Sequence, residues 1–376
     1  FAGSCPGTSD RHRAKLRGGA PIGAKLRSSH DSSLTLICVV VEAKDGYGYS
    51  MPLFDTINAL PFADEQLFFP RELGAWVKRL SAPGGYSALL KELEEDAQEL
   101  RILAMTTEGK VAVLPANEGY HEAWNMGAVV EDCDRVFFAG VDSREVVRFV
   151  AIVSEESLAS LHDKWDVPLE ELSWLSLRHE AAQLESADCT SAGRALALLR
   201  WQEETRYCSR CGGQMRSENG GEIQRCVQCD HLEYPRQDPA VIVLITDEKD
   251  RILLGHNRSW TPAFMSLIAG FVEAGETPEH AVVREAKEEA NLDVEDVRYF
   301  ATQPWPFPRS VMVGFTASVK GTPTPQPDMD EVDAMRWVTR DELTALVESG
   351  ELEIPTHTAI ARKMIDMWLH HLGRAS

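Results

Sequence analysis

The sequence lacks any apolar run long enough to cross a bilayer, and it has few basic residues for its size. A membrane-spanning helix needs about 20 consecutive apolar residues, and no segment of the 376 residues approaches that length. Lysine and arginine number 38 against 59 acidic residues, a formal net charge of −21. A chain this acidic is a poor candidate for tight, sequence-indifferent binding to nucleic acid or anionic membranes, although metal ions can bridge it to a phosphate compound.

Cysteine is also scarce outside one cluster. Four of the eight cysteines are scattered, at Cys5, Cys38, Cys133 and Cys189. This distribution argues against a disulfide framework and favours a reducing compartment, so we expect a cytoplasmic protein. Apolar residues at 44% and charged residues at 26% are ordinary for a globular chain of two or three domains.

The first 30 residues differ from the rest in charge and pattern. Basic residues outnumber acids six to one there, and glycine, serine and proline are frequent, so we predict a disordered tail. The chain begins with Phe1 rather than Met, which suggests a fragment or a misassigned start. The apolar run Leu34–Val41 follows. A signal peptide fits poorly, because no small-residue cleavage site comes next, and we favour a buried first strand.

Residues 31–195 read as a mixed α/β domain without a catalytic constellation. His121 and His162 are isolated, so a packing or dimerisation module is the default interpretation. The expected helices are Arg71–Leu80 and Ser87–Leu100, and the expected strands are Val111–Leu114, Arg135–Ala139 and Val146–Val153. A further helix, Ala195–Tyr207, is predicted to lead into the cysteine cluster.

The cysteine cluster consists of two Cys-x2-Cys pairs separated by 14 residues: Cys208, Cys211, Cys226 and Cys229. Each pair can form a tight knuckle, and two knuckles on a hairpin direct four thiolates at one point, the tetrahedral arrangement that Zn²⁺ prefers. Two disulfides or a redox pair are the alternatives. Four protein ligands leave no open position, so we predict one structural zinc ion per chain.

A second cluster is acidic and lies on a predicted helix. Thr277 suits the N-cap and Pro278 the first helical position, and the helix is expected to end near Ala290. Glu285, Glu288 and Glu289 are spaced so that their carboxylates share one face. They form either a solvated acidic face or a site for Mg²⁺ or Mn²⁺.

The surrounding residues favour the metal site, because residues 270–292 resemble the Nudix box, G-x5-E-x7-R-E-U-x-E-E-x-G-U. The residues in register are Gly270, Glu276, Arg284, Glu285, Ala286, Glu288, Glu289 and Leu292. Asn291 stands where the pattern has Gly, and asparagine is the commonest other residue to accept the left-handed conformation expected there. The resemblance implies that Glu285, Glu288 and Glu289 bind metal, while Glu276 and Arg284 hold the loop and helix in position.

The segment Gln303–Ser310, QPWPFPRS, follows the box. Its prolines predict a stiff wall without regular strand pairing. A four-cysteine ribbon, then Tyr234-Pro235, then the box, then QPWPFPRS resembles the NADH pyrophosphatase branch of the Nudix superfamily, which also removes NAD caps from RNA. The specific motifs cover residues 195–376.

This resemblance implies further roles for single residues. Phe271 would stack on nicotinamide, and Tyr234 would close the pocket from the neighbouring subunit of a homodimer. Glu331 would complete the metal site, whereas Ala334 replaces an acid often seen nearby. The remaining implied substrate-binding residues are Gln303, Trp305, Ser310 and Ala361. The alternatives are core aromatics for Phe271 and Tyr234 and a surface charge for Glu331.

The sequence therefore predicts an α/β (α+β) protein made of a basic tail (1–30), a Nudix-like mixed α/β domain (31–195), a linker helix and C4 zinc ribbon (196–235) and a Nudix α/β/α sandwich (236–376). We expect it to use two or three Mg²⁺ or Mn²⁺ ions to hydrolyse NAD(H) to NMN(H) and AMP, and to remove the NAD cap from RNA. Alternatives are a pyrophosphatase for ADP-ribose or another nucleoside diphosphate, and an inactive Nudix regulator that binds NAD or RNA. No membrane partner is expected.

Overall fold

The computed structural model describes residues 99–114, 135–154 and 172–370, with Leu89, Leu93, Ala123, Asn125, Cys133 and Ser157. The predictions for the basic tail, Leu34–Val41, Arg71–Leu80, His121 and His162 fall outside these residues.

The predicted helix Ser87–Leu100 is wrong at its end, because Leu100 begins a strand. Leu100 lies opposite Val147 in a parallel ladder, so pairing with a distant strand decides its conformation.

Five strands form the first sheet, in the order β3-β4-β1-β2-β5. The predicted strands are confirmed with small shifts at their ends. β4 is buried along its whole length, as expected of a strand covered on both faces. The strands are β1 (Leu100–Thr106), β2 (Lys110–Val113), β3 (Arg135–Val141), β4 (Val147–Val153) and β5 (Ser173–Ser176).

One face of this sheet is covered by α6 (Ser186–Glu204), which follows the short helices α5 (Leu177–Glu180) and η3 (Ala181–Gln183). The prediction placed this helix at Ala195–Tyr207, so its start was nine residues late and its end three residues late. The first half is rich in serine and threonine, which are weak helix formers. It is helical because Cys189, Ala192 and Ala195 are buried in the core against the sheet.

A buried ion network ties α6 to this sheet. Arg148 is completely buried; its guanidinium donates to Asp142 at 2.6 Å and to Asp188 at 2.7 Å. Arg101 donates two bonds of 2.7 Å to the same Asp188 carboxylate. Buried charges are tolerated only when paired in this way, so the network fixes the start of α6 against β1 and β4.

Replacing Arg148 by Met leaves Asp142 and part of Asp188 buried without their counter-charge. We expect Arg148→Met to lower the free energy of unfolding in urea by about 3–5 kcal/mol. Arg144→Met is the matched control, because Arg144 also pairs with Asp142 but its side chain is 58% exposed; its cost should stay below about 1 kcal/mol. Equal losses in the two variants would contradict this role for the buried network.

The cysteine-bearing segment forms a small antiparallel sheet of β6 (Met215–Glu218), β7 (Ile223–Cys226) and β8 (Leu232–Glu233), with η4 (Asn219–Gly221) between the first two strands. Met215 pairs with Cys226, and Arg225 pairs with Leu232. The predicted hairpin is therefore present, and a third strand is added to it.

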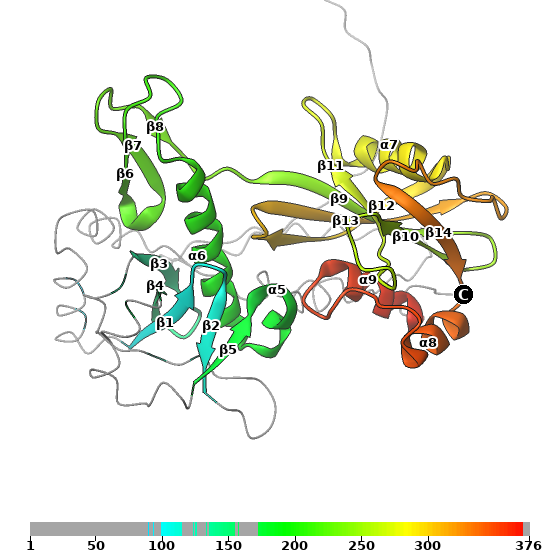
Figure 1. Ribbon diagram of the computed structural model, residues 1–376, viewed down its shortest axis with the longest axis horizontal. Coiled ribbons are helices and arrows are strands. Elements are labelled where there is room, and N and C mark those ends of the chain that lie inside the picture. Colours follow the sequence, from blue (N-terminus) through cyan, green and yellow to red (C-terminus); the bar gives the residue numbers. More distant parts are fainter. Residues whose placement is uncertain are drawn as a thin grey trace, which may run out of the picture. The chain divides into compact units, whose positions relative to one another are not determined.

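The C-terminal sheet has the order β12-β13-β9-β10-β14, with β11 paired to β9. α7 packs on one face, and α8 and α9 pack on the other, so the predicted α/β/α sandwich is confirmed (Figure 1). The elements are β9 (Asp238–Thr246), β10 (Ile252–Asn257), β11 (Ile268–Phe271), α7 (Pro278–Ala290), β12 (Val294–Trp305), β13 (Ser310–Val319), β14 (Val332–Val338), α8 (Arg340–Ser349) and α9 (Ile360–Leu369).

The prediction that prolines exclude QPWPFPRS from a ladder is wrong for its first half. Gln303, Pro304 and Trp305 continue β12 and lie opposite Met312, Val311 and Ser310 of β13. β12 is an edge strand, where the missing N–H of proline leaves no neighbouring strand unpaired. Only the turn between β12 and β13 departs from the ladder.

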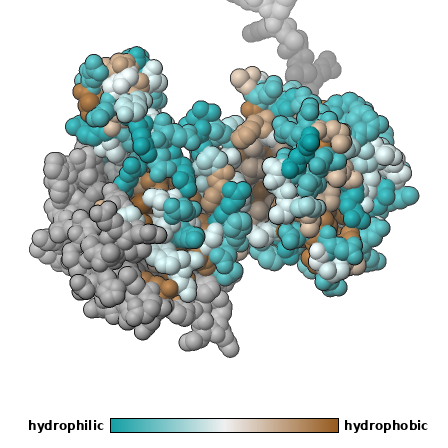
Figure 2. Space-filling model, viewed as in Figure 1, coloured by the Kyte–Doolittle hydropathy of each residue, from teal (hydrophilic) through white to brown (hydrophobic). Residues whose placement is uncertain are grey.

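Within the described residues, no helix has the length and apolar character needed to cross a membrane. The described surface on the face drawn in Figure 2 is mostly hydrophilic.

Candidate functional site

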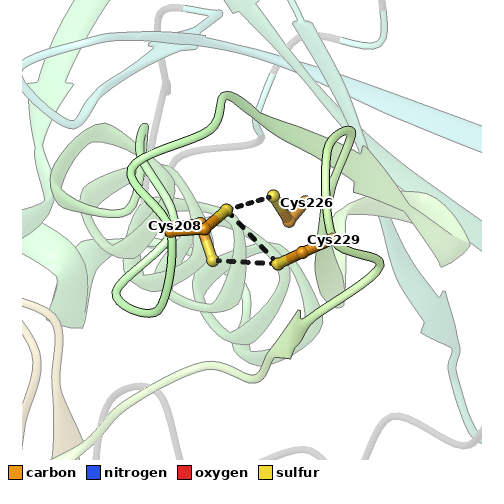
Figure 3. Close-up of side chains that lie close together, drawn as sticks. Cys208, Cys226 and Cys229 are labelled. Carbon is orange, nitrogen blue, oxygen red and sulfur yellow. Dashed lines mark hydrogen bonds between the residues drawn. The ribbon is translucent and has the colours of Figure 1, made fainter.

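The four cysteines of the ribbon converge on one point. Their sulfur atoms all lie within 4.8 Å of one another, and Figure 3 shows the sulfurs of Cys208, Cys226 and Cys229 directed inward. The distance between Sγ atoms is 3.7 Å for Cys208 and Cys229 and 3.4 Å for Cys211 and Cys226. These separations are far longer than a disulfide bond of about 2 Å, and they suit a tetrahedral zinc ion with Zn–S bonds of about 2.3 Å.

The backbone around the cysteines prepares the sulfur atoms for a cation. The amide of Arg210 donates to Sγ of Cys208, and that of Gln228 donates to Sγ of Cys226, both at 3.4 Å. Burial by itself would raise the pKa of Cys226, but the backbone amides of Gln228 and Cys229 lower it to about 7. A thiolate that forms near neutral pH is a good zinc ligand.

The acidic helix α7 begins and ends as predicted. The Thr277 side chain accepts from the amide of His280, and Pro278 is the first helical residue. Asn291 follows the helix in the left-handed conformation, with φ of 52°, and its side-chain amide donates to Gln326 at 3.0 Å. Asparagine therefore adopts the conformation that glycine would adopt at this position of the box.

Arg284 connects the carboxylates at the start of this helix. Its guanidinium donates to both oxygens of Glu276 at 2.9 Å, to Glu285 at 2.8 Å and to Glu288 at 2.9 Å. It also donates to the carbonyl of Phe271 at 2.8 Å, which ties α7 to the end of β11. The arrangement supports the positioning role proposed for Arg284 and Glu276.

The carboxylate of Glu285 can lie against the backbone of β11 because residue 270 is glycine. A Cβ atom on Gly270 would lie only 1.9 Å from a carboxylate oxygen of Glu285, so any other residue would push this side chain away. Glu285 and Glu289 are 8% and 7% exposed, whereas the Glu288 side chain is 60% exposed. Two carboxylates of the box are therefore withdrawn from water, and that of Glu285 lies beside β11.

Burial and neighbouring acids destabilise the charged forms of this pair, so either a proton or a cation would stabilise it. Burial, followed by the charges of Glu285, Glu331 and Asp328, raises the pKa of Glu289 to about 8. Burial also raises the pKa of Glu285, against the opposing effect of Arg284. Glu331 thus faces the box glutamates closely enough to repel them. Arg284 alone does not balance this charge, and carboxylate oxygens are the donors that Mg²⁺ and Mn²⁺ prefer.

Asp328 is a member of this acidic group that the sequence prediction missed. One of its carboxylate oxygens accepts from the amides of Asp330, Glu331 and Val332, so it shapes the loop that carries Glu331. The acidic run Asp328–Asp333 was the available signal. Among the described residues, only the four cysteines bring three or more ligand atoms within 4.8 Å of one another, so the carboxylates are more widely spaced.

An apolar cavity of about 410 Å³ opens on the face of the sheet that carries α9. Three of the predicted substrate residues, Gln303, Trp305 and Ala361, line it. Phe271, Tyr234 and Ser310 are not among its lining residues. Phe271 and Tyr234 are 60% and 61% exposed, and Ser310 lies opposite Trp305 in the ladder.

Gln303 positions the cavity wall. Its side chain is completely buried, donates to the carbonyl of Thr358 at 2.8 Å and accepts from the amide of Ile360 at 2.7 Å. These bonds hold the first residues of α9, and with them Ala361, against β12. Both ends of the amide are therefore used by backbone groups.

Several lining residues of this cavity were not predicted. Trp260 and Phe264 contribute aromatic rings that stack edge to face at 5.0 Å between centroids, and Arg178 reaches the cavity from α5. The Arg178 guanidinium also lies over the ring of Phe307, 5.7 Å from its centroid. Arg178 and the segment that carries Trp260 and Phe264 lie far apart in the chain, so no local pattern in the sequence connects them.

Comparison with known proteins agrees with these observations. The family model described as NUDIX domain matches residues 236–362. A Pseudomonas aeruginosa (strain LESB58) protein called NAD-capped RNA hydrolase NudC is 36% identical over 207 residues, 54% of this chain and 70% of that protein. A Mycobacterium bovis (strain BCG / Pasteur 1173P2) protein of the same description is 38% identical over 213 residues, 54% of this chain and 66% of that protein.

Among solved structures, the chain resembles a NUDIX hydrolase from Nitrosomonas europaea. The identity is 23% and the TM-score 0.37, over 45% of this chain and 94% of the other.

Removal of the metal proposed for the cysteine cluster is expected to affect stability before it affects catalysis. Cys226→Ser, or prolonged chelation, should release zinc and lower the melting temperature by about 2–4 °C for every kcal/mol lost. Zinc can be measured with a colorimetric chelator alongside thermal unfolding. Loss of catalysis with an unchanged melting temperature would contradict a structural zinc site.

The buried Glu289 predicts how stability depends on pH when no divalent cation is added. The pKa of Glu289 in the folded chain, about 8, lies above its ordinary value of 4.5, so folding favours the protonated form. Stability should therefore fall as pH rises from 4.5 through 8, and Glu289→Gln should remove most of this loss. Thermal unfolding at about pH 6 and pH 9 tests this. Glu279→Gln, on the exposed first turn of α7, is the matched control.

Proposed function

The chain belongs to the NADH pyrophosphatase family of Nudix hydrolases, and from this membership we propose that it hydrolyses the pyrophosphate bond of NAD(H). In this reaction a water oxygen bonds to one phosphorus, the bridging P–O bond breaks, and the bridging oxygen leaves with the other phosphate. The products are NMN or NMNH and AMP. We further propose that NAD-capped RNA is a substrate, which would give NMN and RNA with a 5′-monophosphate.

The observation that carries the proposal is the pair of buried carboxylates on α7, Glu285 and Glu289. Burial of two like charges is unfavourable unless cations neutralise them. We propose that Glu285, Glu288, Glu289 and Glu331 hold two or three Mg²⁺ or Mn²⁺ ions there. Such ions, when bound, offset the diphosphate charge and polarise a water molecule.

The chain's own residues supply the geometry around this centre. The hydrogen bonds from Arg284 to its four partners fix the loop, the helix and β11 relative to one another, so the carboxylates stay close together. Glu276 also accepts from the amide of Glu273 at 3.0 Å, which closes the loop before α7. The carboxylate ligands for the metal ions that would bind a diphosphate are therefore already in place, and in-line displacement at phosphorus requires such positioning.

The nicotinamide and adenine rings require apolar contact surfaces. We propose that Trp305 and Ala361 contact one nucleoside in the cavity of about 410 Å³, and that the exposed ring of Phe271 stacks on nicotinamide at the rim. Tyr234, equally exposed, would close the site from the second copy in a homodimer.

Glu288 offers the cleanest test of the metal centre. Because this side chain is 60% exposed and its bond is to Arg284 alone, Glu288→Gln should leave the melting temperature nearly unchanged. Turnover of NADH with Mn²⁺ should fall by about 10³-fold or more, as when a metal ligand for transition-state charge is lost. Glu279→Gln, on the same helix, should retain wild-type turnover. Near-normal turnover by Glu288→Gln would refute the assignment.

A substrate panel distinguishes the proposed activity from its alternatives. NADH, NAD, ADP-ribose, a diadenosine polyphosphate and NAD-capped RNA are compared by kcat/KM with Mn²⁺. Preference for the nicotinamide compounds supports the proposal, whereas preference for ADP-ribose assigns a different pyrophosphatase. Binding of NAD without turnover of any compound would identify a regulator.

A further inference from the structure

A second cavity, separate from the apolar one, lies beside the zinc ribbon. It encloses about 500 Å³ and is lined by residues of β3, the end of α6 and strands β6 and β7. Two of its lining residues, Gly221 and Phe137, are closely packed: Gly221 has a φ of +102°, and a Cβ atom there would lie 2.7 Å from the Phe137 ring. The two cavities share no lining residue.

One wall of this cavity includes the side-chain amide of Gln224. Gln224 is 5% exposed and lines the cavity, yet its side chain forms no hydrogen bond with any residue that the structure describes. Gln202, beside it, is satisfied by the Gly221 carbonyl at 2.9 Å and the Ser217 hydroxyl at 3.2 Å. The Gln224 amide is not among the buried polar atoms that lack a partner, so its polar atoms are accessible to solvent and can bond a ligand that has donors and acceptors.

The cavity is positive in an otherwise acidic protein. Arg135 and Arg206 line it, and neither forms a salt bridge within the described part of the chain. Glu218 is the one acid among the lining residues, and it is already held by Arg216 at 2.8 Å and Arg225 at 2.9 Å. Among the described residues, the Arg206 guanidinium donates only to the carbonyl of Glu203, at 3.1 Å, so guanidinium groups without a carboxylate partner are available to bind an anion.

Tyr207 adds an aromatic surface. Its side chain lines the same cavity and the residue is 65% exposed. Guanidinium groups for a phosphate, a ring for stacking and glutamine amides for a base edge are the three contacts by which proteins hold a single-stranded ribonucleotide.

We propose that this cavity binds one ribonucleotide, with its phosphate at Arg135 and Arg206 and its base on Tyr207 beside Gln224. The nucleotide comes either from the body of an RNA substrate or from a free nucleoside monophosphate. The first source rests on the proposed decapping activity, and the second does not.

Binding is tested first, without catalysis and without added divalent cations. A fluorescent single-stranded RNA with a 5′-monophosphate is titrated with the full-length protein, and AMP is titrated by calorimetry. Tyr207→Ala and Arg206→Gln should each weaken RNA binding about tenfold. Arg210→Gln is the matched control: it removes the same charge from the same ribbon but does not line the cavity, so it should bind as wild type. Gln224→Met removes the amide and should also weaken RNA binding, with circular dichroism to confirm folding.

Kinetics then separates the two sources. If the nucleotide belongs to an RNA chain, Tyr207→Ala and Arg206→Gln raise KM for NAD-capped RNA about tenfold and leave NADH kinetics unchanged. If it is a free monophosphate, AMP affinity falls in these variants and KM for capped RNA does not change. Loss of both RNA and AMP binding in Arg210→Gln to the same degree would assign the effect to net charge and overturn the proposal.

Unchanged RNA and AMP binding in Tyr207→Ala, Arg206→Gln and Gln224→Met would also overturn it. A wild-type protein that binds RNA through Tyr207 but hydrolyses neither NADH nor capped RNA would instead refute the proposed function and leave the nucleotide site in place.

Discussion

The arrangement of the box carboxylates depends on the hydrogen bonds that the Arg284 guanidinium group donates. This group bonds to three carboxylates and to one backbone carbonyl, and these groups come from the loop, the helix and a strand. Without a shared cation, like charges on one helix face would separate into solvent. Arg284 keeps them together on one side only, so the more deeply buried Glu289 still lacks a counter-charge.

The two candidate metal centres differ in how the fold prepares them. At the cysteine cluster, short knuckles and backbone amides place four soft ligands in one closed shell, which leaves no coordination position for chemistry. At the glutamate helix, hard oxygen ligands are spread over α7 and the loop of Glu331, and one side is exposed through Glu288. A closed shell suits a structural role, whereas an open acidic edge suits a substrate that brings its own phosphate oxygens.

Two residues that are unfavourable in their local conformation, Asn291 and Pro304, are tolerated because of the structure around them. Asn291 takes a left-handed conformation and adds a bond to Gln326, so the missing glycine is replaced by a residue with a contact of its own. Pro304 stands inside a ladder because β12 is an edge strand. In both cases the neighbouring structure decides whether an unfavourable residue is tolerated.

By itself the sequence determined the features that depend on short spacing. The cap and the end of α7, the shared face of its glutamates and the two cysteine knuckles all follow from residues within a few positions of one another. Only the tertiary structure decided contacts between distant segments: the start of α6 on the Asp188 network, the fit of Glu285 against Gly270, and both cavities. The physical reason is that helix periods and knuckles are local, whereas burial and unpaired charge depend on which remote segments pack together.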